Sequence, residues 1–136
     1  MPLIAWNEKL SVGVASLDAE HQKLLALLNE FYDATHAGKD AESLGNILNA
    51  LVEYTNFHFA HEEQCLAKAG YPSLADHKKL HEDLTRQVLE KQQQFKSGSH
   101  RTLSLELMTF LKNWLLNHIQ SNDKKYGSYL NRKGVH

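Results

Sequence analysis

Apolar residues recur every three or four positions along four stretches of the chain, and short polar or glycine-containing breaks separate these stretches. In the second stretch, for example, Leu44, Leu48 and Leu51 fall on one face of a helix. This spacing is typical of amphipathic helices that bury one side in a core. The pattern predicts helices over residues of about 19–37, 41–69, 73–96 and 102–120.

Short connections join the four predicted helices, and helices joined in this way pack antiparallel to their neighbours. We therefore expect an all-α, up-down-up-down four-helix bundle that forms a single domain over residues 1–136. Residues 1–17 lack a helical period and should form an irregular arm, and residues 124–136 should form a short tail helix. Ser16 or Asp18 is the expected cap of the first helix, and Asp40 that of the second.

Composition narrows the classes of function. A formal net charge of −1 gives no basic surface for nucleic acid or for an anionic membrane. No apolar run approaches the roughly 18 residues that a membrane-spanning helix needs. A single cysteine, Cys65, excludes an internal disulfide, and the N-terminal residues do not resemble a signal peptide, so we expect a cytoplasmic protein. No apolar stripe is left over for a partner helix, which favours a monomer.

Histidines and carboxylates replace apolar residues within the core-facing rows of all four predicted helices. His58 and Glu62 are spaced i, i+4, as are His77 and His81, so each pair shares one helix face. The first and third helices carry these residues near their starts, and the second and fourth carry them near their ends. In an antiparallel bundle those four segments lie at the same end. The candidate ligands are His21, His58, Glu62, His77, His81, His118 and Asp123.

The chemistry of this set indicates a metal site. A lone histidine on an apolar face is usually a hydrogen-bonded core residue, but seven converging polar groups without a metal would each cost about 1–3 kcal/mol if unpaired. Imidazole together with carboxylate suits iron, and seven ligands are too many for one tetrahedral zinc ion. The count therefore indicates two metal ions that share ligands.

Three nearby residues need separate interpretation. Asp123 follows His118 by five residues, which is about 140° around an ideal α-helix. Either the fourth helix ends at residues 120–122 or a bulge intervenes there. His61 lies off the row of candidate ligands and is expected beside the site or at the surface. For Cys65 a small buried hydrophobe is the favoured interpretation, with a soft metal ligand as the alternative.

The spacing of these residues and the segments around them resemble those of the hemerythrins, in particular the single-domain bacterial members. The resemblance extends over essentially the whole chain. It is carried by Trp6-Asn7 with Ser11-Val12-Gly13-Val14, Leu17-Asp18-Ala19-Glu20-His21, His58-Phe59-Ala60-His61-Glu62-Glu63, Tyr71-Pro72, His77-Lys78-Lys79-Leu80-His81, and Trp114-Leu115-Leu116-Asn117-His118 with Asp123.

The resemblance implies a ligand arrangement around two iron ions. Glu62 and Asp123 would bridge the irons together with an oxo or hydroxo group. One iron would be held by His77, His81 and His118 and the other by His21 and His58, which leaves an open position for O₂ on the second.

Four apolar residues would line the O₂ pocket according to the same resemblance: Leu24, Phe59, Trp114 and Leu116. Helical periodicity also supports Leu24 and Trp114, because each lies one turn from a candidate ligand. The assignment of Leu116 depends on the family resemblance alone, since it lies two residues before His118 and therefore on the opposite face.

The expected function is reversible O₂ binding for storage, transport or delivery, with an oxygen-consuming enzyme as the recipient. On this interpretation the protein is not an enzyme, although a weak peroxidase-type activity is compatible with it. The alternatives are a di-iron enzyme that reduces peroxide or nitric oxide, and a sensor of oxygen or redox state. Turnover assays distinguish the enzyme from the binding protein.

Overall fold

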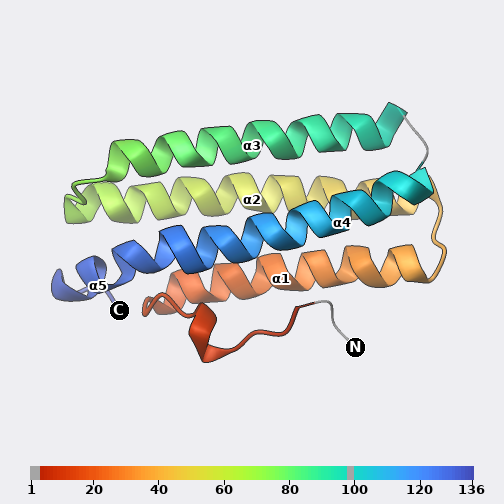
Figure 1. The fold of residues 1–136 in the computed structure, drawn as a ribbon. Coiled ribbons are helices and arrows are strands. Elements are labelled where there is room, and N and C mark those ends of the chain that lie inside the picture. Colours follow the sequence, from red (N-terminus) through yellow and green to blue (C-terminus); the bar gives the residue numbers. More distant parts are fainter. Residues whose placement is uncertain (1–3, 98–99) are drawn as a thin grey trace.

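The computed structural model describes residues 4–97 and 100–136, so the first three residues of the expected arm lie outside it. Four long helices lie side by side and alternate in direction (Figure 1). They are α1 (Ala15–His36), α2 (Ala41–Ala69), α3 (Leu74–Ser97) and α4 (His100–Asn117). The described residues contain no strand. The predicted all-α four-helix bundle is confirmed, and none of the described helices is long and apolar enough to span a membrane.

The ends of the second helix follow from its sequence. The Asp40 carboxylate accepts a hydrogen bond from the Ser43 amide at 2.8 Å and so caps the start of α2. Gly70 ends the helix with a φ of 69°, a left-handed conformation that glycine adopts without steric cost. The bounds of α2 coincide with the range that the hydrophobic pattern predicts.

The first helix begins at Ala15, earlier than the expected residue 19, and the expected cap was wrong. Val14 occupies the cap position and no side chain caps the helix. The Asp18 carboxylate instead accepts hydrogen bonds from the Ser11 hydroxyl at 2.5 Å and from the Val12 amide at 2.8 Å. Asp18 therefore fastens the N-terminal arm to the bundle.

The fourth helix continues into two further elements that close one end of the bundle. A π-helical turn, η2 (His118–Asp123), leads into the short helix α5 (Lys124–Arg132), which lies at the end where α1 and α3 begin (Figure 1). The arm contains a 3₁₀ turn, η1 (Glu8–Leu10). Arm, tail and bundle together form a small hydrophobic cluster, separate from the main core, whose buried members are Val12, Val14, Leu17, Leu66, Tyr126 and Leu130.

The arm and α5 meet at Gly127. A Cβ atom on this residue would lie 2.1 Å from the backbone oxygen of Val12, far inside van der Waals contact. Only glycine permits this approach. This close approach lets the tail pack against the end of the bundle where the candidate ligands gather.

Candidate metal centre

The structure places all seven candidate ligands in one buried cluster. Helix α1 contributes His21, and α2 and α3 contribute the two i, i+4 pairs. The turn η2 contributes His118 and Asp123. None of the seven side chains is more than 6% exposed. The antiparallel topology accounts for this convergence, because it brings the starts of α1 and α3 beside the ends of α2 and α4.

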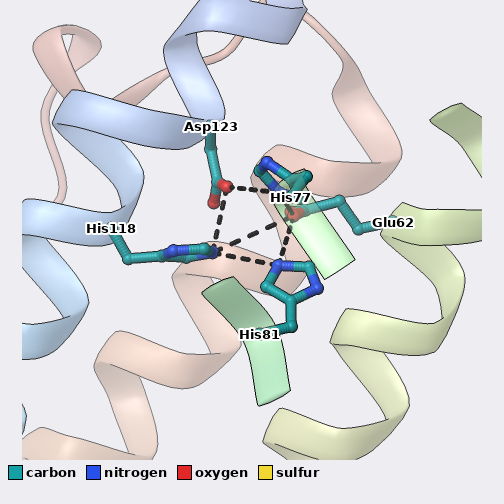
Figure 2. Close-up of side chains that lie close together, drawn as sticks. All are labelled: Glu62, His77, His81, His118 and Asp123. Carbon is teal, nitrogen blue, oxygen red and sulfur yellow. Dashed lines mark hydrogen bonds and ion pairs between the residues drawn. The ribbon is translucent and has the colours of Figure 1, made fainter. Parts of the chain in front are cut away.

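The cluster divides into two groups of atoms suited to a metal ion, and the groups share two carboxylates. One group, shown in Figure 2, consists of Glu62, His77, His81, His118 and Asp123. The other consists of His21, His58, Glu62 and Asp123. Within each group the potential ligand atoms all lie within 4.8 Å of one another. We refer to these as the three-histidine position and the two-histidine position.

Glu62 divides its two oxygens between the positions. Its Oε1 atom lies 2.6 Å from His77 Nε2 and 3.0 Å from His81 Nε2, on the three-histidine side. Its Oε2 atom lies 3.0 Å from His58 Nε2 and 3.6 Å from His21 Nε2, on the other side. A carboxylate in this arrangement can place one oxygen on each of two cations.

Asp123 divides its oxygens in the same way. Its Oδ2 atom lies 3.0 Å from His21 Nε2, and its Oδ1 atom lies 3.0 Å from His118 Nε2 and 3.3 Å from His77 Nε2. The π-helical turn is the bulge that the sequence left as one of two alternatives. It brings Asp123 to the same face as His118.

The donor atoms of the cluster fit metal ions better than they fit one another. Within the described part of the chain, His21 Nε2, His58 Nε2 and both oxygens of Asp123 are buried without a hydrogen-bond partner of good geometry. The Nε2 atoms of His81 and His118 face each other at 3.2 Å. Unpaired buried polar atoms cost about 1–3 kcal/mol each. Imidazole nitrogens and carboxylate oxygens aimed at common points are donors that iron accepts.

The electrostatics of the cluster reflect the two buried carboxylates. Burial lowers the pKa of His21, but the neighbouring Asp123 and Glu62 outweigh burial and raise this pKa to about 9. The pKa of His77 is raised to about 9 for the same reasons. Burial raises the pKa values of Glu62 and Asp123, yet the surrounding imidazoles hold both below their usual values. Both carboxylates therefore stay ionised and attract cations.

Two further carboxylates contact the Nδ1 atoms of candidate ligands, and the sequence analysis did not identify them. Glu20 accepts hydrogen bonds from the Nδ1 atoms of His58 at 2.7 Å and His61 at 2.6 Å. Glu63 lies 3.2 Å from His81 Nδ1. Such contacts fix the ring so that Nε2 faces the metal. No periodic signal could have identified Glu20, because its partner His58 is 38 residues away.

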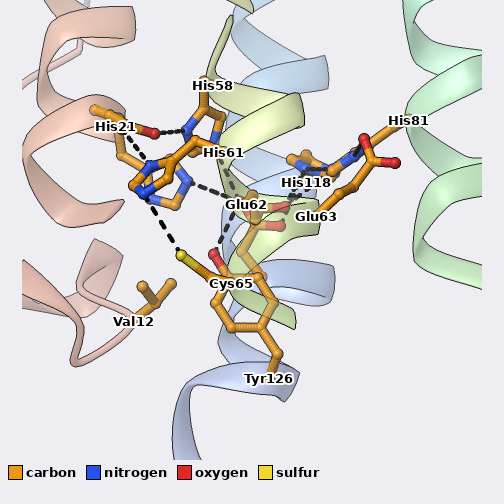
Figure 3. A network of polar contacts seen from close by, with 12 residues as sticks. Val12, His21, His58, His61, Glu62, Glu63, Cys65, His81, His118 and Tyr126 are labelled. Atoms are coloured by element: carbon orange, nitrogen blue, oxygen red, sulfur yellow. Dashed lines mark hydrogen bonds and ion pairs between the residues drawn. The ribbon is translucent and has the colours of Figure 1, made fainter. Parts of the chain in front are cut away.

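Cys65 lies outside both groups. It is half-buried, and its Sγ atom is 3.5 Å from His61 Nε2 (Figure 3). The structure thus buries Cys65 less than the expected small buried hydrophobe, and its thiol contacts a histidine beside the site. His61 itself lies behind the candidate ligands, as expected, between Cys65 and Glu20.

Two of the predicted pocket residues contact the histidine rings directly. Phe59 stacks on His81 with ring centroids 3.8 Å apart, and Trp114 lies parallel to His118 at 6.4 Å. Leu24 is buried in the same core, and Leu116 is half-buried against it. Their role around O₂ stays a prediction.

Comparisons with known proteins agree with this geometry. The family model described as the hemerythrin HHE cation binding domain matches residues 12–130. A bacteriohemerythrin of Stenotrophomonas maltophilia is 36% identical over 126 residues, which are 93% of this chain and 80% of that protein. A bacteriohemerythrin of Methylococcus capsulatus is 31% identical over 96% of this chain and 98% of its own length. The crystal structure of a wild-type hemerythrin superposes with a TM-score of 0.83 at 29% identity, over 94% of this chain and 98% of that one.

Proposed function

Because this chain belongs to the hemerythrin family, we propose that it binds O₂ reversibly at a centre of two iron ions. The observation that carries the proposal is the division of the buried donor atoms into two groups that share Glu62 and Asp123. If the two groups served unrelated sites, they would not have both Glu62 and Asp123 in common. Storage, transport and delivery of O₂ to an oxygen-consuming enzyme are the uses that such binding serves.

Each candidate ligand has a specific role in this proposal. His77, His81 and His118 would hold one iron, and His21 and His58 would hold the other. Glu62 and Asp123, which belong to both groups, would be shared between the two irons, and solvent would supply the remaining oxygen ligand. A bound iron pair would supply the electrons for O₂ binding, and the two-histidine position, which has one protein donor fewer, would leave room for O₂.

The protein ligands favour binding over bond cleavage. Five neutral imidazoles donate less negative charge than the carboxylate-rich sets of ferritin-like di-iron proteins. Glu20 and Glu63 hold His58 and His81 in fixed orientations, which preserves the geometry of the centre when its charge changes. The residues thus stabilise one arrangement through repeated oxygenation and release.

The apolar surroundings serve to exclude water and protons. Phe59, Trp114 and Leu24 are buried, and none of the four predicted pocket residues carries a group that titrates near neutral pH. The indole Nε1 of Trp114 is buried and, in the described structure, has no hydrogen-bond partner. Apolar walls without a titratable group slow the delivery of protons to reduced oxygen species, which supports a binding protein over a peroxide-reducing enzyme.

Oxygen uptake by the anaerobically reduced protein tests this proposal. We expect stoichiometric uptake of one O₂ per chain, full release under vacuum, and no sustained consumption of added hydrogen peroxide or nitric oxide in the presence of a reductant. Sustained turnover of either compound at many equivalents per chain would contradict this proposal and show that the protein is an enzyme.

A further inference from the structure

Tyr126 is a buried phenol in the tail helix that the ligand set leaves without a role. Its side chain is fully buried, and its hydroxyl donates a hydrogen bond to Glu62 Oε2 at 2.8 Å. Figure 3 shows the ring rising from α5 so that the hydroxyl meets the Glu62 carboxylate from below the cluster. The tail helix thus contacts the centre through a side chain as well as through the turn that carries Asp123.

The hydrogen bond reaches only one of the two Glu62 oxygens. Oε2 is the oxygen that faces His58 at 3.0 Å and His21 at 3.6 Å. Oε1, which faces His77 at 2.6 Å, has no contact with the phenol among the hydrogen bonds of the described residues. A carboxylate oxygen has two lone pairs, so Oε2 can accept from Tyr126 with one and bind a cation with the other.

The phenol is held rigidly. Its ring packs in the small cluster of Val12, Val14, Leu17, Leu66 and Leu130, and it lies edge-on to the His77 ring at 5.5 Å. The next residue, Gly127, is pressed against the Val12 carbonyl. Tyr126 therefore cannot follow a rotation of the Glu62 carboxylate, and the hydrogen bond resists that rotation.

The two metal positions depend on Glu62 to different extents. The two-histidine position has only His21, His58 and one oxygen from each carboxylate, whereas the other position has an additional imidazole. We propose that Tyr126 is a positioning residue that fixes the Glu62 carboxylate and thereby stabilises metal at the two-histidine position selectively. This inference rests on the proposed function only in requiring two metal positions that share Glu62. Loss of a hydrogen-bond partner behind a ligand typically costs 10–100-fold in metal affinity.

Iron retention by the full-length, ferrous-loaded protein tests the inference. Anaerobic samples are dialysed against a series of chelator-buffered Fe²⁺ concentrations, and iron per chain is measured at each. In Tyr126→Phe, we expect the weaker-bound iron to dissociate at a free Fe²⁺ concentration about tenfold higher than in the wild type. The concentration at which the tighter-bound iron dissociates should change by less than about threefold. His58→Ala identifies the step that belongs to the two-histidine position, because it removes a ligand from that position alone.

Tyr129→Phe is the matched control. Tyr129 lies on the same helix, and its hydroxyl donates to the carbonyl oxygens of Ala69 and Gly70 at 2.9 and 2.8 Å, away from the ligands. We expect both of its iron steps to coincide with those of the wild type. Equal shifts of both steps in Tyr126→Phe, or no shift, would overturn the inference. The assay does not involve O₂, so a wild type that holds two irons but fails to bind O₂ reversibly overturns the proposed function alone.

Discussion

The Nε2 atom of His118 lies 3.0 Å from Oδ1 of Asp123, although the two residues are five positions apart. In an α-helix this spacing would turn the side chains about 140° away from each other. The chain from His118 to Asp123 is π-helical, and residues five apart are neighbours in that geometry. One wide turn thus supplies both a histidine for the three-histidine position and a carboxylate shared by both positions.

Removal of the Glu62 side chain should abolish the centre. In Glu62→Ala, each position loses one carboxylate oxygen and only Asp123 stays shared between them, so we expect iron to fall from two to below about half an equivalent per chain. Metal analysis after anaerobic loading measures this. Glu53→Ala, an exposed site on the same helix, serves as the control and should retain full iron. Two irons per chain in Glu62→Ala would refute the shared-carboxylate assignment.

Glu20→Ala should weaken the two-histidine position without removing a ligand. The variant leaves the Nδ1 atom of His58 without its acceptor, and we expect iron affinity at this position to fall about 10–100-fold. Competition with a chelator measures the affinity. His61→Ala removes the other partner of the same carboxylate and keeps the contact with His58, so its affinity should stay close to that of the wild type. An equal loss in His61→Ala would show that Glu20 does not act through His58.

Two glycine substitutions should change stability in opposite directions. Gly127→Ala forces a Cβ atom to within 2.1 Å of the Val12 carbonyl oxygen, and the required backbone shift should lower the free energy of unfolding by about 1–3 kcal/mol. Gly45→Ala lies within α2, where the nearest atom is 4.0 Å away on Phe95, and it should raise the free energy of unfolding by about 0.5–1 kcal/mol. Urea denaturation of both variants measures these changes. A neutral Gly127→Ala would mean that α5 is not clamped by the arm.

The iron-free protein should lose stability as the pH rises from about 6.5 to 9. Burial lowers the pKa values of His21 and His77, but Asp123 and Glu62 outweigh it and raise both to about 9. A raised folded-state pKa contributes stability that is complete below the unfolded value of about 6.5 and is lost as the pH passes through 9. Iron affinity should rise over the same range, since iron binds neutral imidazole. Urea midpoints of the iron-free protein that increase from pH 6.5 to 9 would contradict this.

The sequence predicted the architecture because hydrophobic periodicity and helix-stop residues act locally. The range of α2 followed from the apolar row between Asp40 and Gly70. The predicted helix bounds also put the candidate ligands near the starts of two helices and the ends of the other two, which lie at one end of an antiparallel bundle. Where the chain departs from regular helical geometry, local rules were insufficient, and the sequence left Asp123 either beyond the helix or at a bulge.

The contacts missed from the sequence are long-range. Asp18 looked like a helix cap but binds the arm, because its two oxygens accept hydrogen bonds from the hydroxyl of Ser11 and the backbone amide of Val12. The bond from Tyr126 to Glu62 spans 64 residues, and nothing in the local pattern around either residue indicates it. Such contacts depend on how the tail folds back onto the bundle, which periodicity does not specify.

Reversible O₂ binding at two irons is tested most directly by iron content together with visible absorption of the reduced protein before O₂, after O₂ and after purging with inert gas. We expect two irons per chain and a charge-transfer band that develops with O₂ and disappears on purging, over repeated cycles. Fewer than two irons per chain, or immediate oxidation that purging does not reverse, would contradict it.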